Sequence, residues 1–178
     1  NHILTSFEFE TDESKVPVIK DSVDTKIDVL GVLYESATSD DSNVTSYYLS
    51  DKQDLEILSK IVNIGYAKDG FSGITFVLSK DIDFGGAQFN GLGTKVYPFK
   101  GIINGNIYSI NNIVLNNDSE YVGFVAYGEN ARIQNLALNG ITFDIKENSN
   151  AKFVGFVAYG KNITISKLSI TDVKLTNA

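Results

Sequence analysis

The sequence predicts an all-β protein, a parallel β-helix (a solenoid of stacked coils) with one N-terminal capping α-helix and a small N-terminal β segment. Two observations predict it. The string VGFVAYG occurs at residues 122–128 and again, unchanged, at residues 154–160. After each copy the apolar spacing is also shared, because Ile133 and Leu136 are matched 32 residues later by Ile165 and Leu168. Fixed repeats of about 20–50 residues are typical of solenoids, in which each coil buries its face against the next.

Composition limits the partners. The chain has 178 residues, which suits one domain or one repeat array with a small appendage. It has 15 Lys plus Arg against 22 Asp plus Glu, a formal charge of −7. We therefore expect no nucleic-acid partner, since phosphates require clustered Lys and Arg. No run of about 18 apolar residues is present, so we expect no membrane insertion. Without Cys, disulfides and thiolate metal sites are excluded.

Residues 1–49 are predicted to form an N-terminal β cap or the end of a preceding domain. Strand-like alternation appears at residues 3–9, 27–34 and 44–49, separated by stretches rich in Asp and Ser. How these strands pair does not follow from the sequence.

Residues 50–178 are predicted to form the helix-capped repeat domain. Ser50 is the expected N-cap of a helix, with Gln53 completing a capping box and Gly65 ending the helix. The apolar residues that share one face of this helix are Leu55, Leu58, Ile61 and Val62. Because no other stretch of the sequence has a good helix signal, we expect this face to cover the open end of the stack of strands.

The repeat domain is predicted to contain four coils, at about residues 74–84, 99–115, 121–143 and 153–175. The triplet Ile110, Ile113 and Leu115 matches the triplet that starts at Ile133 after 23 residues, and we expect the longer second interval to arise from an insertion at 144–152. Ile110, Ile133 and Ile165 would then form one interior column. Phe124 would lie over Phe156, and Tyr127 over Tyr159, at the strand spacing of about 4.8 Å. An antiparallel sandwich is the alternative, although it does not need repeated sequence.

These residues resemble the GLUG-motif repeats of bacterial surface and secreted proteins. The resemblance covers roughly residues 47–178 and rests on DIDF, PFKGIINGNIYSINNI, YVGFVAYG with IQNLAL, and FVGFVAYG with ISKLSI. It implies a right-handed β-helix in a large cell-surface or secreted bacterial protein, including adhesins and the non-catalytic parts of proteases. The family has no common catalytic residues. The chain departs from its pattern where GNG is replaced by Gly105, Asn106 and Ile107.

We predict no enzymatic activity and no catalytic residues. A β-helix hydrolase needs acidic side chains grouped on one outer face, and only Asp81 and Asp83 are spaced to point the same way. The simplest interpretation is that these two carboxylates face water beside a buried strand. As a metal site they would suit calcium, since a glycine-rich turn with free carbonyl oxygens follows them. The alternative is a carbohydrate-active β-helix that binds, hydrolyses or cleaves a polysaccharide.

Aromatic residues provide the candidate contact surface. We expect Val122, Phe124 and Ala126 to face inward, which turns Tyr121, Val125 and Tyr127 outward. Tyr127 over Tyr159, with Tyr121 over Phe153, would form a flat strip able to pack on a sugar ring or a protein partner. A stacking ladder covered by loops is the alternative.

The sequence thus predicts a non-enzymatic, extracellular or surface-exposed bacterial module that acts as an adhesin stalk, a scaffold, or a surface binding protein or glycan on a cell. A second alternative is the accessory region of a larger secreted protease. Since the last predicted coil lacks a cap, we expect further repeats or end-to-end stacking.

Overall fold

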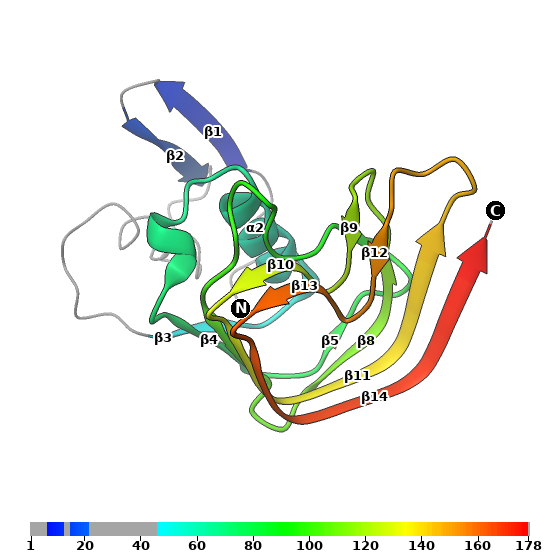
Figure 1. Ribbon diagram of the computed structural model, residues 1–178. Helices are drawn as coiled ribbons and strands as arrows, with labels where there is room; N and C mark the ends of the chain where they lie inside the picture. The colour runs from blue at the N-terminus through cyan, green and yellow to red at the C-terminus, as the bar shows by residue number, and fades with distance from the viewer. Residues whose placement is uncertain (1–6, 13–14, 22–45, 178) are drawn as a thin grey trace.

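The computed structural model describes residues 7–12, 15–21 and 46–177, and in this part of the chain it is all-β with parallel sheets and one α-helix (Figure 1). The short strands are β3 (Ser46–Leu49), β4 (Thr75–Leu78), β5 (Ile82–Asp83), β6 (Gln88–Phe89), β7 (Ile102–Asn104), β8 (Ser109–Leu115), β9 (Tyr121–Val122), β10 (Val125–Glu129), β12 (Phe153–Val154) and β13 (Val157–Lys161). Two strands are much longer, β11 (Arg132–Ile145) and β14 (Thr164–Asn177).

The N-terminal part forms an antiparallel hairpin of β1 (Phe7–Asp12) and β2 (Lys15–Asp21). β1 overlaps the strand predicted at 3–9, but β2 was not predicted, because Pro17 interrupts the pattern and argues against a strand. A two-stranded ribbon has only edge strands, which tolerate proline. The strand predicted at 27–34 lies outside the described residues.

The main sheet is parallel throughout. Its strand order is β3-β4-β7-β11-β8-β5, with β14 on β11 and β6 on β8. Since β3 pairs with β4, residues from Ser46 onward belong to this sheet and not to the segment predicted to end at residue 49. Two smaller parallel sheets pair β9 with β12 and β10 with β13. Figure 1 shows β11 and β14 running side by side along their whole length.

The 32-residue repeat fixes the register of these last strands. Ile133 lies beside Ile165, Leu136 beside Leu168, and Leu138 beside Ile170, as predicted. Phe124 stacks on Phe156 with ring centroids 5.5 Å apart and planes 5° apart. The second copy of VGFVAYG therefore lies on the first.

The predicted 23-residue period is wrong. Ile110 lies beside Leu138, 28 residues later, and the neighbour of Ile133 on the preceding coil is Ile103. The interior column is thus Ile103, Ile133 and Ile165, without Ile110. The insertion predicted at 144–152 is shorter than expected, since β11 continues to Ile145.

Left-handed residues bend the long strands. The residues with positive φ inside β8, β11 and β14 are Asn112, Asn135, Gly140, Lys167 and Asp172. Each one directly precedes an inward-facing apolar residue, as Asn135 precedes Leu136. Gly and Asn adopt this conformation readily, so one strand turns two corners without losing its parallel neighbour.

The helix is α2 (Lys52–Asn63), and its apolar face is buried as predicted. Its N-cap is Asp51, not Ser50: the Asp51 side chain accepts from the Asp54 amide at 2.9 Å. Ser50 instead donates its amide to Asp54 Oδ2 at 2.7 Å. Asp forms an N-cap as well as Ser, so the sequence left two adjacent candidates. Gly65 follows the helix with φ of +82°, as predicted.

Two polar side chains fix α2 against the glycine-rich loop that follows β6. Ser59 Oγ donates to the Gly91 carbonyl, and Asn63 Oδ1 accepts from the Gly93 amide at 2.8 Å. The helix lies behind the strands in Figure 1, whereas β14 is nearest to the viewer. A 3₁₀ turn, η1 (Lys68–Phe71), leads from it into β4.

Candidate functional site

The four aromatic residues predicted as a contact surface do lie together. Tyr127 stacks on Tyr159 with centroids 4.2 Å apart, and Tyr121 stacks on Phe153 with centroids 5.2 Å apart. The two stacks meet edge to face, since Tyr121 and Tyr127 are 5.1 Å apart at 88°. β9 and β12 position one stack and β10 and β13 the other, so both follow from the parallel register.

This aromatic cluster is not a flat exposed strip. Tyr127 is only 8% exposed, whereas Phe153 is 45% exposed. Val125, predicted to face outward, is fully buried. A bend at Gly123 and Phe124 separates β9 from β10 and resets the inward and outward alternation, so that Phe124 and Val125 are both buried. The most exposed member of the cluster is therefore Phe153, whereas Tyr121 and Tyr159 are half-buried.

The phenol of Tyr127 is held in its neutral form. Desolvation, followed by its side-chain hydrogen bond to Tyr159, raises the pKa of Tyr127 to about 12. The negative charges that Tyr159, Tyr121 and Glu129 acquire on ionisation act in the same direction. The cluster is therefore an uncharged, amphipathic surface at neutral pH.

Asp81 and Asp83, the predicted calcium candidates, both bond to the neighbouring strand. On β8, the Ser109 amide donates to Asp81 Oδ1 at 2.8 Å and Asn112 Nδ2 donates to Asp83 Oδ1 at 3.2 Å; Asp83 Oδ1 also accepts from the Gly85 amide at 2.8 Å. The Gly85 amide, and then the Asn112 side chain, lower the pKa of Asp83. In the described part of the chain, no three His, Cys, Asp or Glu residues are grouped as metal ligands would be. Calcium binding at Asp81 and Asp83 stays a prediction.

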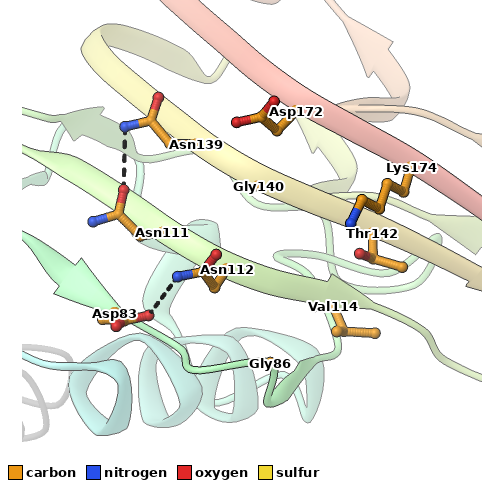
Figure 2. Close-up of a pocket in the computed structure, with 10 residues that line it drawn as sticks. All are labelled: Asp83, Gly86, Asn111, Asn112, Val114, Asn139, Gly140, Thr142, Asp172 and Lys174. Carbon is orange, nitrogen blue, oxygen red and sulfur yellow. Dashed lines mark hydrogen bonds between the residues drawn. The ribbon is translucent and has the colours of Figure 1, made fainter.

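The structure contains a polar groove that the sequence did not predict. It has a volume of about 540 Å³ and crosses β8, β11 and β14, with Asp83 of β5 at one end (Figure 2). One wall is formed by Asn111 and Asn139, which lie side by side on β8 and β11, and Thr171 of β14 continues this row beyond the lining. Hydrogen bonds join this row: Asn139 Nδ2 donates to Asn111 Oδ1 at 3.2 Å, and Thr171 donates to Asn139 Oδ1 at 2.8 Å.

The opposite wall is the row Val114, Thr142 and Lys174. Between the walls runs a row of left-handed residues, Asn112, Gly140 and Asp172, whose φ angles are 54°, 82° and 53°. Asn112 Nδ2 donates to Asp83 Oδ1 at 3.2 Å across the lower end. The middle residue of this row, Gly140, has no side chain.

Sequence analysis missed this groove because its rows depend on the 28-residue register. With a 23-residue period, Asn111 does not fall beside Asn139 and Asn112 does not fall beside Gly140. The available signal was the dipeptide pattern itself: Asn111-Asn112 and Asn139-Gly140 both precede an inward isoleucine, Ile113 and Ile141.

Comparisons with known proteins add one relative. The chain is 32% identical over 124 residues to a protein of Evansella cellulosilytica that carries the provisional name Gly-rich membrane protein. The similar region makes up 63% of this chain and 14% of that protein, so the chain corresponds to a small part of its relative. No family model matches the chain, and no solved structure matches it. Among the described residues, no helix is both long and apolar enough to cross a membrane.

Proposed function

We propose that this chain is a non-enzymatic module of a bacterial cell-surface or secreted protein, a right-handed parallel β-helix of the GLUG-repeat type that serves as an adhesive scaffold. The observation that carries the proposal is the residue-on-residue pairing of β11 with β14 at an offset of 32 residues. Stacked coils form a stiff rod whose outer faces are free to present contact groups. The sequence similarity to a much longer bacterial protein named as a membrane protein supports a surface location.

The contact groups that we propose are those of the aromatic cluster. Phe153 is its most exposed member and Tyr159 is half-buried, as is Tyr121, and all three are aromatic residues of the kind that anchor protein and glycan contacts. Tyr127 lies beneath them and holds Tyr159 in place through its stack and its hydrogen bond. A rigid, neutral aromatic platform loses little conformational entropy when it binds.

A cell-adhesion assay, in which cells retain beads coated with the protein, tests this function. Fluorescent beads coated with the protein are expected to adhere to bacterial or host cells, and beads coated with the double variant Phe153→Ser and Tyr159→Ser to adhere at least several-fold less. The double variant Tyr48→Ser and Val96→Ser is the control, because both residues are exposed apolar positions outside the cluster. If the cluster variant and the control variant adhered equally well, the aromatic cluster would be excluded as the contact surface. Adhesion of neither variant nor parent chain to any cell would leave only a spacer role.

The free edge of β14 is the second element of the proposal. In the described chain β14 pairs only with β11, and Val173 and Leu175 are 56% and 70% exposed, whereas their neighbours Ile141 and Phe143 are buried. An edge of this length with apolar side chains attracts another strand. We propose that further repeats, or another copy stacked end to end, cover it.

Amide hydrogen exchange tests whether the outer edge of β14 is open. In dilute protein the outward-facing amides of β14 are expected to exchange much faster than those of β11. If end-to-end stacking occurs, raising the concentration will slow them, and Leu175→Lys will prevent that slowing. Protection of β14 that is independent of concentration in the isolated chain would contradict an open edge.

A further inference from the structure

The polar groove across β8, β11 and β14 has an opening at Gly140. This residue has φ of +82°, and an added Cβ would lie 2.9 Å from Asn112 Oδ1. The residues before and after it in the same row, Asn112 and Asp172, both carry polar side chains. At Gly140 the row therefore has no side chain of its own, with the Asn112 amide close below it and the Asp172 carboxylate above it (Figure 2).

The walls offer donors and acceptors that are already fixed in place. Asn139 uses one N–H toward Asn111 and one oxygen lone pair toward Thr171, which leaves one donor and one acceptor position unused by these two bonds. Thr142 and Lys174 supply further donors from the other wall. Because the ladder holds the amides, a ligand need not order them when it binds.

The charges of the groove select against ionic and apolar ligands. Asp83 and Asp172 oppose Lys174, so the local formal charge is −1, which disfavours phosphate or another anion. Val114 is the one aliphatic side chain on the described lining, which gives an apolar ligand little surface. A divalent cation would have to compete with the Gly85 amide and the Asn112 side chain for Asp83 Oδ1.

Hydroxyl groups fit this lining, because each one both donates and accepts. Neighbouring hydroxyls can bond at once to an amide and a carboxylate across the opening. The rows continue from strand to strand at about 4.8 Å, so polar groups follow one another along the stack at this spacing. The volume of about 540 Å³ lies in the range of small-molecule sites, about 300–1,000 Å³.

We propose that this groove binds a neutral, hydroxyl-rich glycan chain laid across β8, β11 and β14, with one sugar seated over Gly140. The proposal adds a glycan contact to the surface function proposed above and rests on that function. It places this ligand on the sheet face of β8, β11 and β14, a separate surface from the aromatic cluster on β9, β10, β12 and β13.

Filling the opening tests the proposal. Gly140→Asn puts a side chain into the space while keeping a residue type that accepts positive φ, and its nearest contact is the movable end of Asn112. Gly73→Asn is the matched control, since Gly73 has φ of +79° with nothing within 4 Å and lies outside the groove. Both variants should remain folded, which the dispersion of their amide spectra will show.

The measurement is an NMR titration of ¹⁵N-labelled protein with neutral tetrasaccharides of glucose, mannose, galactose and N-acetylglucosamine, and separately with calcium. At least one tetrasaccharide is expected to shift the side-chain amides of Asn111 and Asn139 and the backbone amide of Gly140. Gly140→Asn should weaken that binding about tenfold or more, corresponding to about 1.4 kcal/mol, and Gly73→Asn should not change it.

Three results would overturn the proposal: no tetrasaccharide shifts these signals, Gly140→Asn binds as tightly as the parent chain, or calcium alone shifts them. Its failure is separable from failure of the surface function. Loss of glycan binding with cell retention preserved removes only the groove assignment, whereas glycan binding without any cell retention removes only the adhesive function.

Discussion

Tyr127 lies nearly flat on Tyr159, with planes 19° apart and centroids 4.2 Å apart, although 32 residues separate them in the chain. The two tyrosines occupy the same position in identical strings, yet Tyr127 is nearly enclosed and Tyr159 is half-buried. The copy of the repeat that is covered by the next copy carries the buried member of each pair of side chains. Equivalent residues in the two identical strings are therefore expected to contribute unequally to the free energy of unfolding.

Tyr127 makes stability depend on pH in the alkaline range. The pKa of Tyr127 is raised from 10.0 to about 12, chiefly by desolvation, so the folded protein holds this proton more tightly than the unfolded chain. The resulting stabilisation is fully present below pH 10 and is lost as pH rises from 10 to 12. Chemical denaturation across this interval should show a fall in stability, and Tyr127→Phe should reduce that fall. An identical pH dependence in the variant would contradict the assignment.

Truncation of the paired phenylalanines should also be unequal. Phe124 is fully buried between Phe89 and Phe156, whereas Phe156 is partly exposed. Phe124→Ala is expected to lower the free energy of unfolding by about 3–5 kcal/mol through cavity formation. Phe156→Ala should cost clearly less, because one side of its ring already faces solvent. Urea denaturation of both variants measures the difference, and equal losses would mean that a further layer covers Phe156.

Gly93 should tolerate no side chain. It has φ of +89°, and an added Cβ would overlap the Tyr127 carbonyl oxygen, a backbone atom that cannot move without breaking its bond to the Phe99 amide. Gly93→Ala is expected to lower the melting temperature strongly or prevent folding. Gly73→Ala, at a similar φ but in open space, should cost only about 1 kcal/mol from backbone strain. Comparable thermal denaturation curves for the two variants would disagree with this packing.

Asn63 should be needed to dock the helix. Its side chain accepts from the Gly93 amide at 2.8 Å and donates to the Gly91 carbonyl at 3.1 Å. Asn63→Ala removes both bonds and is expected to cost about 1–3 kcal/mol. Lys52→Ala, at an exposed position of the same helix, should be nearly neutral. Circular dichroism during urea denaturation distinguishes docking from helix propensity, because helix propensity predicts that Asn63→Ala stabilises the protein.

The sequence predicted the register between β11 and β14 correctly and the register between β8 and β11 wrongly, for a definite reason. Along a bent strand the inward residues are spaced alternately three and two positions apart, as in Ile133, Leu136, Leu138, Ile141 and Phe143. The triplet beginning at Ile133 therefore looks the same as the triplet beginning at Leu138. Matching Ile110 to Ile133 instead of Leu138 is a slip of five residues, which turns 28 into 23. Only the identical string VGFVAYG removed this ambiguity, and it exists only in the last two coils.

The sequence by itself determined the all-β class, the helix after Ser50 and its buried face, and the stacking of Phe124 on Phe156 and Tyr127 on Tyr159. These follow from local periodicity and from an exact duplication, both of which are present in the chain as written. The tertiary structure alone decided that Val125 is buried, that Ile110 lies beside Leu138, and that Gly140 lies between Asn112 and Asp172 in a groove. Each of these depends on where a backbone bend occurs and on which coil lies beside it, and such contacts between distant residues leave no unique local pattern.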